Sequence, residues 1–159
     1  MATQKRAVPK KNAPTATNRK ARFEYSIEET IEAGIVLLGT EVKSLRAGRV
    51  NIADAYSSVK GGELWLWNAR IQEWSHGNRN NHEPTRARKL LVSARQLSKL
   101  TGLLKVRGTT LVPLKIYFND RGYAKVLLGV AHGKTQYDKR QTIKNRDWKR
   151  EQGRLMKNQ

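Results

Sequence analysis

Residues 109–130 read TTLVPLKIYFNDRGYAKVLLGV, and this stretch sets the class of the fold. Val112, Leu114 and Ile116 fall on one side of an extended chain and Leu111 falls on the other, which is the period-two pattern of a strand. The following NDRG is typical of a tight turn, and the remaining residues are again apolar and extended in character. The stretch therefore predicts an antiparallel hairpin.

Similar patterns recur nearer the N-terminus. Phe23, Tyr25 and Ile27 alternate with polar residues, and a run of β-branched and Leu residues between two glycines fits a more buried strand. A Lys-Gly-Gly segment at 60–62 supplies the turn of another hairpin. Together with the 109–130 hairpin these patterns predict about six short strands. The additional strands are expected within the ranges 23–27, 32–43, 52–59 and 64–69.

One helix is predicted between the strands. Ser93 and Gln96 form a capping box, and Leu97, Leu100 and Leu104 then follow at helical spacing. Residues 75–89 are poor in apolar side chains and rich in Asn, Gly, Pro and Arg, so they are expected to form a long exposed loop.

These elements show no alternation of single strands with helices, so a parallel sheet is not expected. The pattern favours a mainly β chain: a small antiparallel β-barrel of the oligonucleotide-binding (OB) type with flanking helices. A sandwich of five or six strands is the alternative, and periodicity does not choose between the two.

Charge is the strongest signal in the composition. The chain of 159 residues has 32 Lys and Arg against 13 Asp and Glu, a net charge of +19. Solubility of a small domain needs a net charge of only about 2–8, so a polyanionic partner is expected. Residues 1–22 carry +7, residues 23–130 carry +6 and residues 131–159 carry +6. We therefore expect a flexible basic arm at 1–17, an RNA-binding domain at 18–132 and a basic tail at 133–159.

Several classes of protein are disfavoured. The chain has no cysteine, which excludes disulfides, thiolate zinc sites and thiol nucleophiles. The basic N-terminal residues are not followed by an apolar segment of a signal peptide, and the longest apolar stretch, residues 33–38, is too short to span a membrane. A soluble, cytoplasmic protein without membrane association is expected.

Catalytic patterns are weak. Residues 129–135, GVAHGKT, hold three residues between their glycines, whereas a phosphate-binding P-loop needs four. His76 and His82 could bind a metal ion together with Glu83, but the composition of a polar loop explains them better. The remaining carboxylates are scattered. The sequence predicts no metal, no cofactor and no enzymatic activity.

Aromatic and basic side chains are interleaved along the predicted strands, and this combination is typical of proteins that bind single-stranded or looped RNA. About half of the aromatics must fill the core, and periodicity does not say which half. The aromatic residues are Tyr25, Tyr56, Trp65, Trp67, Trp74, Tyr117 and Tyr123, and the basic residues are Arg19, Lys20, Arg22, Lys43, Arg46 and Arg49.

The basic tail has good helix formers but no continuous apolar stripe. Trp148 and Leu155 share one helical face, while Ile143 lies about 140° away from Trp148. A helix of this kind docks poorly on its own domain, so we expect a tail that is disordered alone and becomes helical on RNA. A merely solvated charged terminus is the alternative.

Five segments, in this order along the chain, resemble the bacterial SsrA-binding protein family, also called small protein B. They cover most of the chain from Asn18 onward and are NRKARFEY at 18–25, GTEVKSLR at 39–46, NIADAY at 51–56, RKLL at 88–91 and GKTQYDKR at 133–140. The resemblance implies an OB-type barrel that binds tmRNA, the hybrid transfer and messenger RNA that rescues stalled ribosomes. It also implies a binding adaptor for trans-translation without catalytic activity.

The resemblance further implies which residues contact RNA. The tRNA-like domain of tmRNA would be bound by seven residues that match the family's motifs, and Arg19 and Lys20, which follow Asn18, are added to this set. Glu32 can accept hydrogen bonds from base or ribose donors. These tmRNA-binding residues are Asn18, Arg19, Lys20, Arg22, Tyr25, Glu32, Lys43, Arg46 and Tyr56.

In the same family the tail becomes helical in the empty mRNA channel and thereby reports the absence of a message. Tyr137 stands where some relatives have His, and its ring can still stack on a base. The positions with this implied role are Gly133, Lys134, Tyr137, Asp138, Lys139, Arg140, Ile143, Lys144, Arg146 and Trp148. The implied partners are tmRNA, the 30S ribosomal subunit with its 16S rRNA, and elongation factor Tu on the aminoacylated tmRNA, with this chain acting as a monomer.

Two other functions stay open on residue patterns alone. A ribosomal protein could thread its basic ends permanently through rRNA, and a small RNA-processing enzyme could cleave RNA with a metal ion. The second of these lacks a cluster of carboxylates in the sequence.

Overall fold

The structure is a computed structural model that describes residues 14–133 and 136–157, without the side chains of residues 14, 78 and 136–138. Most of the predicted arm and Lys134 of the predicted tail therefore lie outside the described residues, as do the side chains of Tyr137 and Asp138. No helix in the described ranges is long and apolar enough to cross a membrane.

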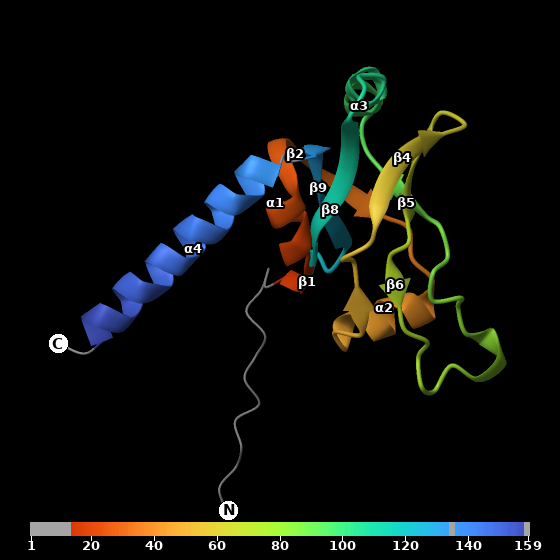
Figure 1. The fold of residues 1–159 in the computed structure, drawn as a ribbon. Coiled ribbons are helices and arrows are strands. Elements are labelled where there is room, and N and C mark those ends of the chain that lie inside the picture. Colours follow the sequence, from red (N-terminus) through yellow and green to blue (C-terminus); the bar gives the residue numbers. More distant parts are fainter. Residues whose placement is uncertain (1–13, 134–135, 158–159) are drawn as a thin grey trace, which may run out of the picture.

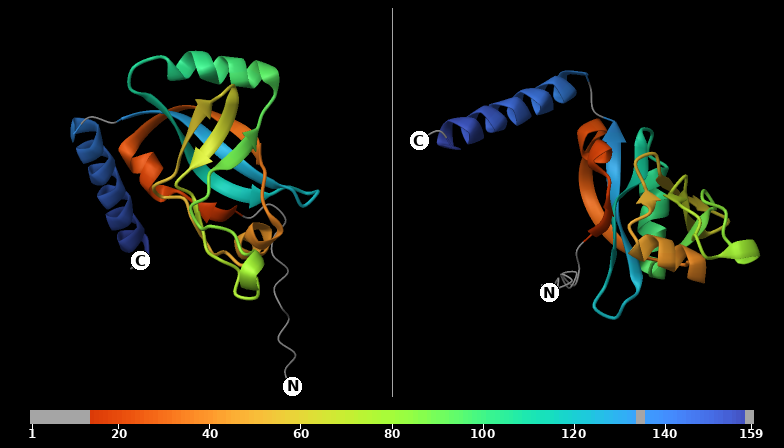
Figure 2. Two further views of the ribbon diagram at one scale, coloured as in Figure 1. Left: turned by 90° about the vertical axis from the view of Figure 1, so that its right-hand side faces the viewer. Right: turned by 90° about the horizontal axis from the view of Figure 1, so that it is seen from below.

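Six strands pair in a closed ring (Figures 1 and 2). Their order is β8–β4–β5–β7–β2–β9, and β9 pairs again with β8 through the hairpin that the sequence predicts. All of these pairings are antiparallel. The ring strands are β2 (Tyr25–Ile35), β4 (Tyr56–Lys60), β5 (Glu63–Trp67), β7 (Arg88–Leu91), β8 (Thr109–Phe118) and β9 (Ala124–Gly133). The prediction of a mainly β chain with flanking helices is confirmed.

The ring encloses the main core. Leu64 and Leu66 of β5, Leu111 of β8 and Leu128 of β9 point inward and are fully buried. The opposite side of β8 is also covered, because Val112 and Leu114 pack against Ala21, which lies in a short helix (Arg19–Glu24) outside the ring. β8 therefore has two buried faces, as its apolar character requires.

Strand β1 (Pro14–Thr17) pairs with β8 beyond the point where β4 joins that strand. The prediction that residues 1–17 have no fixed structure is therefore wrong for residues 14–17. Ala16 is opposite Ile116, and it packs against the main core. A small separate sheet is made by β3 (Val50–Asn51) and β6 (Arg70–Ile71).

Two helices replace parts of two predicted strands, whereas residues 25–27 and 32–35 of those strands lie in β2. Helix α1 (Arg19–Glu24) occupies the start of the predicted 23–27 strand, and helix α2 (Gly39–Arg46) occupies the end of the predicted 32–43 strand. Both differences have a local cause: at the start of each helix, one side chain accepts a hydrogen bond from a backbone N–H, and this bond stabilises the first turn. The Asn18 side chain accepts from Ala21, and the Glu41 side chain accepts from Leu38.

Helix α3 (Ala94–Leu104) follows the prediction closely. Ser93 is its N-cap, and Ser93 and Gln96 exchange the two hydrogen bonds of a capping box. In Figure 1 this helix lies at one end of the ring and α2 lies at the other. A single 3₁₀ turn, η1 (Asn78–Asn80), interrupts the long loop between β6 and β7.

Helix α4 (Gln136–Lys157) extends away from the ring and contacts α1 (Figures 1 and 2). Its side chains from residue 139 onward are largely exposed, including Trp148 at 62%. The structure thus has the helix that the sequence predicts for the RNA-bound tail, and disorder of the isolated tail stays a prediction.

Candidate nucleic-acid interface

Asn18 joins three separate segments of the chain. Its side-chain oxygen accepts a hydrogen bond from Ala21 at 3.0 Å, and its amide nitrogen donates to the carbonyls of Ile52 at 3.1 Å and Pro113 at 3.0 Å. The residue is only 3% exposed. Asn18, which is predicted to bind tmRNA, thus holds α1 against β8 and against the segment before β4.

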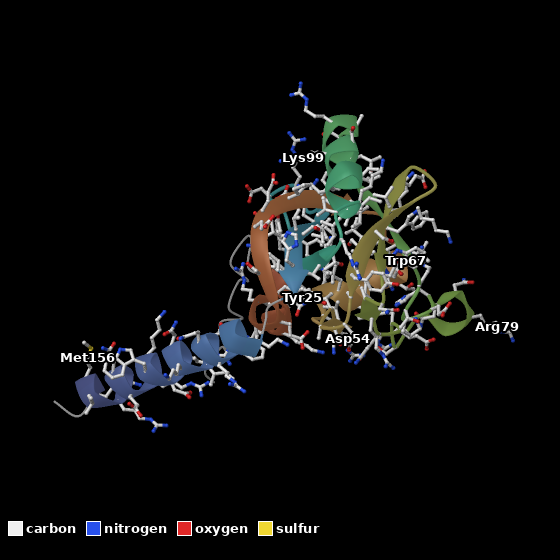
Figure 3. All side chains as sticks on the ribbon, turned by 45° about the horizontal axis from the view of Figure 1, so that its top comes forward. Tyr25, Asp54, Trp67, Arg79, Lys99 and Met156 are labelled. Carbon is white, nitrogen blue, oxygen red and sulfur yellow. The ribbon has the colours of Figure 1, made fainter. Side chains whose placement is uncertain are left out.

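A pocket of about 310 Å³ lies at this junction. Lys20 comes from α1, Tyr25 from the start of β2, and Asp54 and Tyr56 from the segment leading into β4. The pocket is lined further by Asn18, Ala21, Glu24, Ala53, Ala55, Thr110 and Val112. Three predicted tmRNA-binding residues of the 18–25 segment, Asn18, Lys20 and Tyr25, thus meet a fourth, Tyr56, from a distant part of the chain around one concavity, which we call the tyrosine pocket (Figure 3 labels Tyr25 and Asp54).

The charge within the tyrosine pocket is nearly balanced. Lys20 Nζ lies 3.1 Å from Asp54 Oδ1, and this hydrogen bond raises the pKa of the Lys20 ammonium, which stays charged at neutral pH. Glu24 adds a second acid to the lining. Two tyrosine rings and hydrogen-bonding groups therefore dominate the chemistry of this pocket, and further cations come from its surroundings.

A strongly cationic pocket of about 540 Å³ lies where α1 meets α4. The guanidinium of Arg146 is 5.6 Å from the ring centre of Phe23, which is within the range of a cation–π contact. The lining residues are Arg19, Lys20, Arg22, Phe23, Arg146 and Arg150. The structure thus brings Arg146, a predicted tail residue, beside three of the residues predicted to bind tmRNA.

The other predicted residues lie apart from the tyrosine pocket. Lys43 and Arg46 are exposed on α2, and the Arg46 guanidinium lies 5.5 Å from the ring centre of Phe118. Glu32 is exposed on β2, where its carboxylate accepts a hydrogen bond from the Tyr117 hydroxyl. The predicted set is therefore spread over the tyrosine pocket, α1, α2 and the outer side of β2.

A buried charged cluster fixes α2 to the ring, and charge patterning gave no sign of it. Glu41 accepts hydrogen bonds from Arg86 and Arg88, and Arg88 also donates to the carbonyls of Ala69 and Pro84. Burial alone would raise the pKa of the Glu41 carboxyl, but hydrogen bonds from Arg86, the Leu38 amide and Arg88 outweigh burial and hold that pKa below its ordinary value.

His82 also lies inside the protein, so the predicted exposed loop at 75–89 is partly wrong. The imidazole Nε2 of His82 lies 2.9 Å from the carbonyl oxygen of Ile71. Because a carbonyl only accepts, Nε2 carries the proton in this hydrogen bond, and Nδ1 accepts from the Thr40 hydroxyl. Over residues 14–133 and 136–157, no three His, Asp or Glu side chains gather closely enough to hold a metal ion.

The model of the SmpB protein family matches residues 15–158. This chain belongs to the SmpB family. The family predicted from the five sequence segments is confirmed.

Relatives within the SmpB family match nearly the whole chain. An SsrA-binding protein of Novosphingobium aromaticivorans is 61% identical over 147 residues, which are 92% of this chain and 92% of that protein. An SsrA-binding protein of Mesorhizobium japonicum is 57% identical over 154 residues, 97% of each chain. A chain of the solved structure described as "tmRNA-SmpB: a journey to the center of the bacterial ribosome" has a TM-score of 0.66 and 50% identity, over 82% of this chain and 95% of that one.

Most of the described tail positions that the SmpB resemblance implies are distributed along one exposed helix, α4. Gly133 ends β9 opposite Tyr25, so it belongs to the ring. Trp148 and Ile143 are both exposed. The remaining described positions on α4, with side chains half-buried or exposed, are Lys139, Arg140, Lys144 and Arg146.

Proposed function

We propose that this chain binds the tRNA-like domain of tmRNA and acts as an adaptor for trans-translation. The observation that carries the proposal is the tyrosine pocket, where Lys20 and Tyr25 meet Tyr56, which comes from a distant part of the chain. The SsrA-binding relatives, one of which is 61% identical, supply the identity of the RNA.

The tyrosine pocket suits an unstacked base of a folded RNA loop. Tyr56 is 43% exposed, so its ring is available for stacking, and Tyr25 is half-buried beside it. The Lys20 ammonium gives a charge-assisted donor to phosphate, while Asp54 can accept from base or ribose donors. In this proposal Asn18 does not touch RNA and instead positions the walls of the pocket.

Cations around the pocket would neutralise the phosphates of the same RNA. Arg19 and Arg22 on α1, and Lys43 and Arg46 on α2, supply fixed positive charge on two sides of the ring. Phosphate contacts of this kind orient an RNA without reading its sequence. Glu32, held by Tyr117, would read a donor on the RNA rather than a phosphate.

We further propose that α4 enters the empty mRNA channel of the 30S subunit and contacts 16S rRNA there. Its exposed basic side chains and the exposed Trp148 ring suit phosphate contacts and base stacking. In this reading the chain is a cytoplasmic monomer with an OB-type barrel and no catalytic activity, and elongation factor Tu joins it on the aminoacylated tmRNA.

Substitution of the two pocket tyrosines tests the tmRNA site. Tyr25→Ala and Tyr56→Ala should each weaken binding of the isolated tRNA-like domain by about tenfold, since loss of one stacked base costs about 1–3 kcal/mol. Tyr123→Ala is a matched control, because Tyr123 is 65% exposed beside the β8–β9 turn and does not line the pocket. Equal affinities of all three variants and the parent chain in a gel-shift titration would contradict the proposal.

Truncation tests the tail separately. A chain ending at residue 132 should retain most of its affinity for the tRNA-like domain and lose peptide tagging on stalled ribosomes in a reconstituted translation system. Combined loss of binding and tagging would contradict this division of labour, as would full tagging by the truncated chain.

A further inference from the structure

Two tryptophans stand on the outer side of the ring, away from the core. Along β5, Leu64 and Leu66 point inward and are buried, while Trp65 and Trp67 alternate with them and are half-exposed. Their ring centres are 6.3 Å apart, and the planes are inclined at 39°. Adjacent half-exposed indoles on an outward sheet face are unusual for a surface that meets only water, and such patches mark interaction sites.

The two indoles are held differently. Trp67 Nε1 donates to Ser58 Oγ at 2.8 Å, which fixes the ring, and the Lys60 ammonium lies 5.5 Å from the ring centre. Trp65 Nε1 makes no hydrogen bond within the described part of the chain, so this donor is available to a ligand. The rings line a shallow pocket of about 380 Å³ together with Lys60, Gly61, Glu63 and Ala87.

Strand register connects these indoles with the tyrosine pocket. Tyr56 is directly opposite Trp67, and Ser58 is directly opposite Trp65, so all four side chains share the outer face of the β4–β5 hairpin. On the other side of β5, Trp65 is opposite Lys89 of β7. An aromatic row therefore runs from Tyr56 through Trp67 to Trp65 and ends at a lysine. Figure 3 shows Trp67 on the side of the molecule away from α4.

We propose that Trp65 and Trp67, which we call the tryptophan platform, bind unpaired RNA bases by stacking. Successive aromatic rings with cations beside them are what single-stranded nucleic acids need, because the rings take the bases and the cations take the phosphates. This inference goes beyond the proposed function, since it concerns unpaired nucleotides outside the tyrosine pocket whichever RNA they belong to.

Charge favours RNA over an apolar protein segment as the occupant. Lys60 flanks the rings, and Glu63, the one acid in the pocket lining, is paired with Lys89 at 2.8 Å, so these three side chains together carry one net positive charge. The net charge of the chain is +19, which attracts a polyanion over a long range. The ammonium of Lys60 is close enough to the Trp67 ring to contact the phosphate of a base stacked there.

The test uses the full-length chain and a single-stranded oligoribonucleotide of about eight nucleotides, a length within the range that one OB fold binds. Trp65→Ala and Trp67→Ala should each weaken its binding by about tenfold, whereas Trp65→Phe should bind nearly as well as the parent chain because a phenyl ring still stacks. Trp74→Ala is the matched control, since Trp74 is a half-buried indole that packs on His76 outside the platform. Thermal unfolding of each variant checks that the fold is retained.

Cross-linking locates the bound strand. Oligonucleotides carrying 5-iodouridine should cross-link to the peptide that contains residues 63–67. Unchanged oligonucleotide affinity of both alanine variants, or cross-links confined to the tail and the tyrosine pocket, would overturn the platform. The Tyr25→Ala variant with the tRNA-like domain is measured in parallel, so failure of the platform and failure of the proposed function give different results.

Discussion

The side chains of Glu41 and Arg88 form an ion pair in which Arg88 Nε and Glu41 Oε1 are 2.8 Å apart and both side chains are 0% exposed. Arg86 adds a second, partly exposed guanidinium on the same carboxylate. One carboxylate thus ties α2, with its exposed Lys43 and Arg46, to the segment that enters β7.

Removal of the Glu41 charge should destabilise the protein strongly. Glu41→Gln leaves Arg88 buried without its counter-ion, which costs about 3–5 kcal/mol of unfolding free energy. Glu63→Gln is the control, because Glu63 pairs with Lys89 at the surface, where such a pair contributes at most about 1 kcal/mol. Urea unfolding measures both variants, and equal losses would contradict the importance of burial.

Stability should fall in acid because of the same carboxyl. The folded-state pKa of Glu41 lies below its ordinary value of 4.5, so the unfolded chain takes up this proton first as pH falls. The stabilisation is therefore complete above about pH 4.5 and is lost as pH falls through the folded-state pKa. Urea midpoints measured from neutral to acid pH should show a drop that is smaller in Glu41→Gln; an identical drop would exclude Glu41 as its source.

Asn18 should matter for stability as well as for RNA binding. Asn18→Ala removes the cap of α1 and leaves the Ile52 and Pro113 carbonyls without their donor, a loss of about 2–3 kcal/mol. Asn18→Asp keeps the capping acceptor but places a carboxylate against two carbonyls, so it should be no more stable than the alanine variant. An aspartate variant with the stability of the parent chain would show that capping is the main role of the residue.

Salt dependence should report the phosphate contacts of α1. If about six to ten phosphates are neutralised, affinity for tmRNA falls by roughly 10³ to 10⁵ between 50 and 200 mM salt. Arg19→Ala should lower the slope of log affinity against log salt by about 0.9, the contribution of one phosphate. Arg79→Ala is the control, because Arg79 lies in η1 at the far tip of the molecule in Figure 3. Equal slopes for the two variants would contradict a phosphate contact of Arg19 on α1.

Local sequence signals predicted the parts of the fold that depend on nearby residues. The β8–β9 hairpin carries its alternation and its turn in one continuous segment, and α3 carries its own capping box. Helices α1 and α2 were missed because tertiary contacts stabilise them: Asn18 also bonds to Pro113, and Glu41 also bonds to Arg88. A charged pair with no solvent exposure cannot be recognised from residue type, since Glu and Arg are ordinarily exposed.

The candidate site likewise depends on contacts between distant residues, which the sequence did not predict. Tyr25 and Tyr56 of the tyrosine pocket were named through resemblance to a family, because composition alone could not choose them among the seven aromatics on or beside the predicted strands. The pocket exists only once Asn18 has joined segments that are far apart in the chain. The row from Tyr56 to Trp65 likewise depends on the register between β4 and β5.

Ring closure also constrains how the chain can fold during synthesis. Strand β2 pairs along most of its length with β9, and the partner of Tyr25 is Gly133, more than a hundred residues later in the chain. Until β9 has been made, β2 has one open edge, and contacts between such distant segments form slowly. The ring should therefore close only after nearly the whole chain has left the ribosome, which makes this protein a late and comparatively slow folder.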